Sequence, residues 1–453
     1  MAESTNTIQK EIQDREAKEK RELRRKRRRR NQILAILTLI LFVCLIVAII
    51  GTGVWYIMHR GAGKTAGGGA ATTEETTIDN LFESEDEIVK PEETNTEPAL
   101  TPEQQLDAIL DEAFISQMPL EDKVAGLFIV TPESITGVNK AVKAGDGTKD
   151  ALNKYAVGGI VYASQNMQDA AQFTEMVSNT TLYSRYALFT CVAEEGGSST
   201  SLEKAGLADK TDSEQAMGTG ADAAKAYEAS GKIADSMLTY GLNLNFAPVA
   251  DLATVQDSYL KDASYGSDAA LAASFVTSAV QGMQEKGISS CLKYFPGAAD
   301  MKEDPAKGMA TSERTAEQLA AEEFTVFKAG IDAGADMVMV GHVAVPALTG
   351  DNTPCSLSSA VITDKLRNEL GFNGVIITDA MNKGAITEYY EADEAAILAL
   401  KAGCDMILCP DDFEKAYNGV LEAVQNGTIS EERINDSLRR IYRIKYAGMM
   451  PEA

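Results

Sequence analysis

The sequence predicts an α/β protein built as a (β/α)8 barrel of the TIM type, preceded by one transmembrane helix and a disordered tether. Three observations predict this arrangement. Residues 33–58 form an uncharged apolar run, residues 59–102 are rich in Gly, Ala, Thr and Glu, and residues 103–453 alternate short apolar runs with helical patterns. The chain has 453 residues and is 45% hydrophobic, so it can bury the core of one large barrel.

The apolar run at residues 33–58 is long enough to cross roughly 30 Å of hydrocarbon as a helix. Trp55 and Tyr56 lie at its far edge, where amphipathic rings settle at an interface, and a cleaved signal peptide would have a shorter apolar core. The tail 1–32 is basic and ends in an unbroken cationic run from Arg24 to Arg30. By the positive-inside rule, the amino terminus is cytoplasmic and the carboxyl-terminal domain lies outside the cell membrane.

The segment 59–102 has few large apolar residues and many acidic ones, so it cannot bury enough surface to fold. We expect it to act as a tether that holds the following domain away from the membrane. The rival interpretation of the basic tail as a nucleic-acid-binding arm is weaker, because the membrane anchor already explains where the tail lies.

The segment 103–453 contains eight candidate strands and the helical patterns between them. The strands are expected at 126–130, 158–163, 188–193, 242–247, 288–295, 337–343, 374–379 and 406–410. Helices are expected at 222–238, 268–285, 315–333, 362–370 and 391–402, among others. A doubly wound open sheet would give a similar string, but no G-x-G-x-x-G follows the first strand, which disfavours dinucleotide binding.

Composition excludes several classes of function. The net charge is -25, and the acidic carboxyl-terminal domain disfavours nucleic acid as a partner. The six cysteines form no C-x-x-C pair and are interpreted as small buried hydrophobic residues. With only His59 and His342 in the chain, a histidine-built metal site is nearly excluded, and the sequence implies no metal or organic cofactor.

The strand predicted at 374–379 ends in a carboxylate, Asp379, two positions after the apolar run Val375, Ile376 and Ile377. In parallel α/β folds the chemistry gathers at the carboxyl ends of the strands, so we expect Asp379 to face a pocket. The alternative is that Asp379 caps the helix that follows.

Ten motifs, whose order and spacing together are specific, run through the whole of this domain. They are Met118-Pro-Leu-Glu-Asp-Lys-Val124, Leu127-Phe-Ile-Val130, Gly158-Gly-Ile-Val161, Glu195-Gly-Gly197, Asn245-Phe-Ala-Pro-Val249 with Asp251, Lys293-Tyr-Phe-Pro-Gly297, Ala333-Gly-Ala-Asp336, Gly341-His-Val343, Leu370-Gly-Phe-Asn-Gly-Val-Ile-Ile-Thr-Asp379-Ala-Met381 and Ile429-Ser-Glu-Glu-Arg-Ile434. This set resembles glycoside hydrolase family 3, in its single-barrel β-N-acetylglucosaminidase (β-N-acetylhexosaminidase) type.

The resemblance implies that Asp379 is the nucleophile of a retaining glycosidase. Such a mechanism also needs a proton donor on the other side of the scissile bond. The family uses a His in an Asp-Ser-His loop, and the matching loop here reads Asp304-Pro305-Ala306. The imidazole is absent.

Other family residues are absent too. The family's Lys-His-Phe-Pro-Gly-His-Gly is represented by Lys293-Tyr294 and, after the Phe-Pro-Gly turn, by Ala298 and Ala299. The family's Asp-Gln-Glu-Gly-Gly motif, whose Asp binds sugar hydroxyls, has Ala193 in place of the Asp and Glu194 in place of the Gln. The family's Arg-Ser-Phe-Gly motif, whose Arg also binds substrate, has Ala263 in place of the Arg. Each lost charged partner removes on the order of 1.5–3 kcal/mol of recognition. The resemblance therefore implies a barrel with impaired catalysis.

A second interpretation keeps catalysis, with a carboxylic acid in place of the missing His. Glu303 and Asp304 lie in the same loop, with Asp300 nearby, and Glu194 or Glu195 ends another strand. Carboxylic acids are the usual donors in glycosidases. A substitute acid explains the missing His but not Ala193 or Ala263, which favours the impaired barrel.

The residues retained from the family are candidate sugar contacts: Lys293, Tyr294, Glu195, Asp251 and His342. Structural roles compete with these assignments. Lys293 would neutralise Asp379 or Asp251, Tyr294 would fill volume, and His342 would be a hydrogen-bonded core residue. The resemblance implies cell-envelope glycans with N-acetylhexosamine, such as peptidoglycan fragments, as the ligand or ancestral substrate.

Overall fold

The computed structural model describes residues 102–298 and 300–447. The predicted basic tail and transmembrane segment, and all but the last residue of the predicted tether, lie outside these ranges. Within them, no helix has the length and apolar character needed to cross a bilayer.

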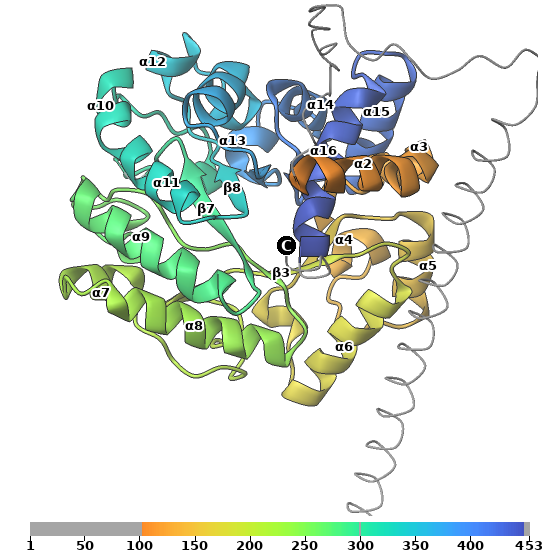
Figure 1. Ribbon diagram of the computed structural model, residues 1–453, viewed down its shortest axis with the longest axis horizontal. Helices are drawn as coiled ribbons and strands as arrows, with labels where there is room; N and C mark the ends of the chain where they lie inside the picture. Colours follow the sequence, from red (N-terminus) through yellow and green to blue (C-terminus); the bar gives the residue numbers. More distant parts are fainter. Residues whose placement is uncertain (1–101, 299, 448–453) are drawn as a thin grey trace, which may run out of the picture. The chain divides into compact units, whose positions relative to one another are not determined.

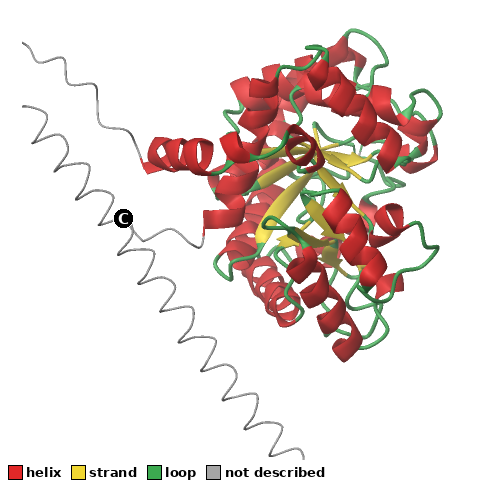
Figure 2. Cartoon of the chain, turned by 90° about the vertical axis from the view of Figure 1, so that its right-hand side faces the viewer, coloured by secondary structure: helices red, strands yellow, loops and turns green. Residues whose placement is uncertain are grey.

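Eight parallel strands close into a barrel, with helices around the outside (Figures 1 and 2). Around the barrel the order is β1-β10-β9-β8-β7-β6-β3-β2, so the predicted (β/α)8 fold and all eight predicted strands are confirmed. The strands are β1 Phe128–Val130, β2 Gly159–Val161, β3 Phe189–Val192, β6 Leu244–Asn245, β7 Ser289–Phe295, β8 Met337–Val340, β9 Val375–Ala380 and β10 Met406–Leu408. A short antiparallel hairpin, β4 Glu194–Gly196 and β5 Ser199–Thr200, follows β3.

The barrel strands are apolar because both of their faces are buried, one against the barrel interior and the other against helices. In β9, Val375 to Asp379 are all buried. Val375 pairs with Met337 of β8, and Ile377 pairs with Met406 of β10. Both neighbours of β9 are therefore fixed in register.

Helices cover the barrel, and Figure 1 shows α8, α9 and α11 following one another around its outside. The α-helices are α2 Pro102–Ala113, α3 Leu120–Ala125, α4 Pro132–Thr136, α5 Asp146–Lys154, α6 Ala170–Tyr183, α7 Glu214–Thr219, α8 Ala224–Thr239, α9 Ala269–Gln284, α10 Ala316–Ala321, α11 Glu323–Asp332, α12 Pro346–Thr349, α13 Gly384–Thr387, α14 Ala392–Ala402, α15 Phe413–Gln425 and α16 Glu431–Tyr446. A π-helix, η6, spans Ala360–Glu369, and single 3-10 turns are η1 Ile115–Gln117, η2 Ser164–Asn166, η3 Lys261–Ala263, η4 Pro305–Lys307 and η5 Cys355–Leu357.

Two predicted helices differ in form. The helix expected at 362–370 is the π-helix η6. The expected helix at 315–333 is divided into α10 and α11 at Glu322, whose ψ of -79° departs from helical geometry. Arg314 forms ion pairs of 2.7 Å with both Glu322 and Glu323. Neighbouring residues of one continuous helix do not face the same partner, so the break lets both carboxylates reach the guanidinium.

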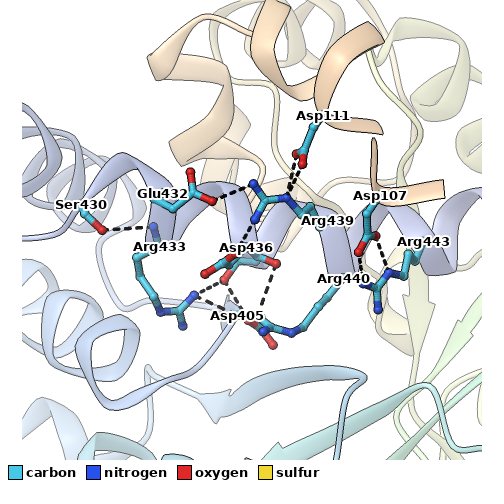
Figure 3. A network of polar contacts seen from close by, with 11 residues as sticks. Asp107, Asp111, Asp405, Ser430, Glu432, Arg433, Asp436, Arg439, Arg440 and Arg443 are labelled. Carbon is cyan, nitrogen blue, oxygen red and sulfur yellow. Dashed lines mark hydrogen bonds and ion pairs between the residues drawn. The ribbon is translucent and has the colours of Figure 1, made fainter. Parts of the chain in front are cut away.

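The buried carboxylate of Asp405 joins the amino-terminal end of β9 to the last helix, α16 (Figure 3). Its side chain is 0% exposed and accepts hydrogen bonds from Arg367 at 2.7 Å, Ser437 at 2.8 Å and Arg440 at 3.0 Å. It also accepts the backbone N–H of Ile376 in β9 at 3.0 Å. One carboxylate thus holds a strand, η6 and α16 together.

On its outer side α16 pairs with α2 through two arginines one helical turn apart, Arg439 and Arg443 (Figure 3). Arg439 binds both carboxylate oxygens of Asp111 at 2.7 Å, and Arg443 binds both oxygens of Asp107. The Arg443 contact is bidentate, whereas Arg439 reaches both oxygens of Asp111 through its Nε alone. Together they attach the helix that follows the tether to the carboxyl-terminal helix.

We predict that Asp405→Ala lowers the free energy of unfolding by about 3–5 kcal/mol, because it leaves buried guanidinium nitrogens without their carboxylate. Urea unfolding followed by circular dichroism measures this loss. The partly exposed Asp111 provides the control, since Asp111→Ala is expected to cost about 0–1 kcal/mol. Equal losses in the two variants would contradict the assignment of Asp405 as the central contact.

Candidate active site

Asp379 lies at the carboxyl end of β9, where the carboxyl ends of all eight parallel strands meet. Its side chain is 6% exposed, and both of its oxygens have partners. One oxygen accepts the backbone N–H of Ala380 at 2.7 Å, and the other forms a 2.7 Å ion pair with Lys383. Asp379 is therefore held in place by residues of its own strand-to-helix loop.

Burial alone would raise the pKa of Asp379, but Lys383 and His342 outweigh it. The positive charge of Lys383, the neighbouring imidazole and the two hydrogen bonds together hold the pKa of Asp379 below its ordinary value. Asp379 is consequently an anion at neutral pH. The charge of Lys383 and the two hydrogen bonds thus stabilise the carboxylate form of Asp379.

His342 follows β8 and is fully buried. Its Nδ1 lies 2.7 Å from the hydroxyl of Ser356, and its Nε2 lies 3.0 Å from the carbonyl oxygen of Ala380. An imidazole that donates from Nε2 to this carbonyl and accepts at Nδ1 is neutral, and burial lowers its pKa further. His342 thus orients the peptide next to Asp379, in the hydrogen-bonded core role, and neither ring nitrogen is left for a sugar in this conformation.

Lys293 of β7 is buried and forms an ion pair with Glu195 of the β4–β5 hairpin. The neutralising role considered for Lys293 is thus filled through Glu195 rather than through Asp379 or Asp251, because the hairpin brings Glu195 over the barrel mouth. The ring centroid of Tyr294 lies 5.4 Å from the ammonium of Lys293 and 5.4 Å from that of Lys383. The half-buried aromatic ring therefore lies close to both lysines of the two lysine–carboxylate pairs.

Asp251 fixes the strand end that carries Lys293 and Tyr294. Its carboxylate is buried and accepts the backbone N–H of Tyr294 at 2.5 Å, as well as that of Ala298. Between these donors lies the Phe-Pro-Gly turn, where Gly297 has φ of +126° and a Cβ would lie 2.6 Å from the side chain of Glu323. Asp251, predicted as a sugar contact, here positions the backbone that shapes the mouth of the barrel.

The candidate acids in the loop after β7 have different surroundings. Asp304 is partly exposed and caps η4 by accepting the N–H of Ala306 at 2.9 Å. Glu303 is exposed, and Asp300 accepts a hydrogen bond of 2.7 Å from Ser312. The η4 turn packs against Gly384, the first residue of α13, which follows β9 and Asp379 in the chain.

Three site residues were missed by sequence reasoning: Lys383, Tyr259 and Glu214. Lys383 carried a signal, since it stands four residues after a strand-end Asp. Burial, and then the charges of Asp251, Tyr294, Asp379 and Asp304, raise the pKa of the Tyr259 phenol, so it remains neutral. Glu214 is buried, lies 3.2 Å from the N–H of Val249 and has its pKa raised by burial and by Glu195.

Glu194 and Glu195 are adjacent in β4 and have different partners, as expected for an extended strand. Glu195 reaches Lys293, whereas Glu194 accepts the backbone N–H groups of Ser201 at 2.5 Å and Leu202 at 2.6 Å. Asn245 of β6 fixes the backbone of Glu194 by one hydrogen bond in each direction, both 2.9 Å. Burial raises the pKa of Glu194 to about 7.

Among residues 102–298 and 300–447, no group of three or more His, Cys, Asp or Glu side chains is arranged to hold a metal ion. The chemistry available at the barrel mouth is that of carboxylates, lysines and two tyrosines.

A closed parallel barrel with an ionised Asp at the carboxyl end of a strand places that side chain where the chemistry of such barrels gathers. The profile of the glycosyl hydrolase family 3 N-terminal domain matches residues 119–444, and the chain belongs to this family. The resemblance seen in the sequence motifs is thereby confirmed.

The relatives agree in class. A protein of Stenotrophomonas maltophilia strain R551-3 named β-hexosaminidase is 30% identical over 284 residues, which cover 60% of this chain and 82% of that protein. A family 3 β-N-acetylglucosaminidase structure from Paenibacillus sp. strain FPU-7 is 32% identical, with a TM-score of 0.69 over 74% of this chain and 64% of the other. A β-N-acetylhexosaminidase structure from Beutenbergia cavernae is 25% identical, with a TM-score of 0.65 over 73% and 99%.

We predict that Glu194 makes stability depend on pH. Its carboxyl group has a pKa near 4.5 in the unfolded chain and about 7 in the folded one. Between these values the unfolded chain binds fewer protons, so the free energy of unfolding falls as pH rises from about 4.5 to 7 and then levels off. A shift of this size corresponds to roughly 3 kcal/mol.

The variant Glu194→Gln removes this titration while keeping an acceptor for Ser201 and Leu202. Urea-unfolding curves from pH 5 to pH 8 are expected to show a smaller decline for Glu194→Gln than for the unmodified protein. The exposed Glu175 of α6 is the control, and Glu175→Gln should retain the original pH dependence. A parallel decline in all three proteins would contradict the assignment.

Proposed function

We propose that this chain is a membrane-anchored, extracytoplasmic family 3 barrel of the β-N-acetylhexosaminidase type, which binds N-acetylhexosamine-containing glycans of the cell envelope and hydrolyses them poorly. The family and its β-hexosaminidase type rest on the comparisons above. The weak hydrolysis rests on one observation, the 2.7 Å ion pair between Asp379 and Lys383.

The ion pair opposes nucleophilic attack in two ways. To reach an anomeric carbon, Asp379 must give up a charge-assisted hydrogen bond whose loss costs about 1.5–3 kcal/mol. Its lowered pKa also marks a weakly basic and hence weakly nucleophilic carboxylate. Each 1.36 kcal/mol added to the barrier slows the reaction about tenfold.

Proton delivery is weak as well. Of the two histidines in the chain, His342 has both ring nitrogens engaged, and His59 lies outside the described residues. Asp304 is partly exposed, and its carboxylate accepts the backbone N–H of Ala306, so in this conformation it acts as an acceptor. A donor must be protonated to serve the leaving group.

Glycan binding is supported by the aromatic and polar groups at the barrel mouth. Tyr294 and Tyr259 are both partly buried there and remain neutral, because burial raises their pKa values. An aromatic face beside fixed charged groups suits a sugar, which presents an apolar ring face and a rim of hydroxyls.

The extracytoplasmic location rests on the sequence alone. The apolar run 33–58 follows a basic tail, which supports a single membrane span with a cytoplasmic amino terminus. Cell-wall glycans such as peptidoglycan fragments would be within reach of a barrel tethered on the outer side.

A second candidate function is an active retaining glycosidase with Asp379 as nucleophile and Asp304 as proton donor. One observation favours it: the η4 turn, which Asp304 caps, packs against Gly384, five residues after Asp379 in the chain. Carboxyl pairs of this kind perform retaining hydrolysis when they flank the scissile bond.

Hydrolysis of a chromogenic N-acetylglucosaminide distinguishes the two functions. We predict slow turnover by the unmodified protein, an increase of about tenfold to a hundredfold in Lys383→Met, and loss of all turnover when Asp379→Asn is added. Met keeps most of the volume of Lys and removes its charge. Fast turnover by the unmodified protein that falls sharply in Asp304→Asn would instead establish the second function.

We also predict that an N-acetylglucosamine oligosaccharide binds to the protein without fast turnover, and that Tyr294→Ala weakens this binding about tenfold through loss of a stacking face. Isothermal titration calorimetry measures the affinity. Tyr389 is exposed and serves as the control position, since Tyr389→Ala is expected to leave the affinity unchanged. Absence of binding to both proteins would contradict glycan recognition.

A further inference from the structure

A cavity of about 240 Å³ lies behind the β4–β5 hairpin, between the loop that follows it and helix α8. Its lining includes the buried side chains of Glu194, Thr200, Leu202 and Ile233. Glu195, the neighbour of Glu194 in β4, pairs with Lys293 and does not line this cavity. The cavity is therefore separate from the site built around Asp379.

Thr200 provides the first indication of a ligand. Its hydroxyl oxygen is buried, its side chain is 5% exposed, and it has no hydrogen-bond partner among the described residues. A buried hydroxyl without a partner is unfavourable, and native proteins satisfy most such groups. Because Thr200 lines the cavity, a ligand inside it is well placed to hydrogen-bond to this hydroxyl.

Glu194 provides the second indication. It faces Thr200 across the hairpin and is 2% exposed. Burial, only partly offset by two backbone N–H groups, raises its pKa to about 7, so the folded protein holds a carboxylate close to neutralisation. A cationic donor placed beside it would favour the ionised form.

The outer part of the cavity is charged, whereas two of its inner walls are apolar. Lys210 and Lys232 are exposed and line the opening, with Asp209 and Asp235 beside them. Leu202 and Ile233 supply apolar surface within. The lining thus offers a buried acidic group, an apolar wall, and two exposed lysines that are accompanied by the further acidic groups Glu203, Asp209 and Asp235.

We propose that this cavity is a second binding site that takes a small zwitterion of the amino-acid class. The ammonium group donates to Glu194 and Thr200, the carboxylate meets Lys210 and Lys232, and an aliphatic side chain packs on Leu202 and Ile233. A volume of about 240 Å³ accommodates a molecule of this size and is small for an oligosaccharide. The site does not depend on the function proposed for the barrel mouth.

Calorimetric titration of the purified full-length protein with L-alanine, D-alanine, L-leucine and L-lysine tests the proposal. We expect saturable binding of at least one of them at pH 8, weaker by about tenfold at pH 6, because a group of pKa about 7 is mostly protonated there. Ethylamine and acetate, which each carry one half of the zwitterion, are expected to bind at least tenfold more weakly.

Two variants and a control locate the binding. Glu194→Gln introduces the residue that the family motif carries at this position, so the fold is expected to persist, and it should weaken binding at least tenfold and abolish the pH dependence. Thr200→Val should weaken binding several-fold while keeping the side-chain shape. Glu175→Gln, an exposed change on α6, should leave the affinity unchanged.

Thermal melting curves of each variant establish that it is folded before the titrations are compared. The proposal is overturned if none of the four amino acids binds, if Glu194→Gln binds as tightly as the unmodified protein, or if ethylamine alone binds as well as the amino acids.

Discussion

The carboxylate of Asp405 is the contact on which the placement of β9 depends. It lies fully buried, receives three arginine or serine donors from η6 and α16, and accepts the N–H of Ile376 at 3.0 Å. Ile376 is three residues before Asp379, so the contact fixes the position of β9 along the barrel axis. The position of Asp379 is thus set in part from the opposite end of its own strand.

At the other end, the barrel mouth contains two lysine–carboxylate pairs, and both ammonium groups lie 5.4 Å from the ring centroid of Tyr294. Lys293 pairs with Glu195 and Lys383 pairs with Asp379. Buried charges require such partners, since an unpaired one would shift its pKa and lose its charge. The consequence for chemistry is that the carboxylate expected to attack is already neutralised by a lysine.

The β4–β5 hairpin connects this mouth with the cavity behind it. Alternation along a strand sends Glu195 to the barrel mouth and Glu194 to the opposite side. Asn245 fixes the backbone between them from the neighbouring strand β6. The pair Glu194 and Glu195 therefore supplies one carboxylate to each of two sites. Gly196 and Gly197, which follow this pair, adopt the positive φ values that the tight turn requires.

The sequence by itself determined the eight strands, the barrel class, the family and the place of Asp379, because these follow from local patterns: apolar runs buried on both faces, and a carboxylate at the end of one of them. It could not determine which charges meet. Lys293 was interpreted either as a sugar contact or as a partner that neutralises Asp379 or Asp251, and it pairs with Glu195, which is 98 residues away in the chain.

Only the tertiary structure decided that Lys383 forms an ion pair with Asp379. It also decided that His342 and Asp251 form hydrogen bonds with backbone groups. Tyr259 and Glu214 were added to the set of site residues in the same way. The physical reason is that side-chain partners depend on how loops from different strands close over the barrel mouth. That closure is set by packing between segments distant in the chain, and no periodicity within one segment records it.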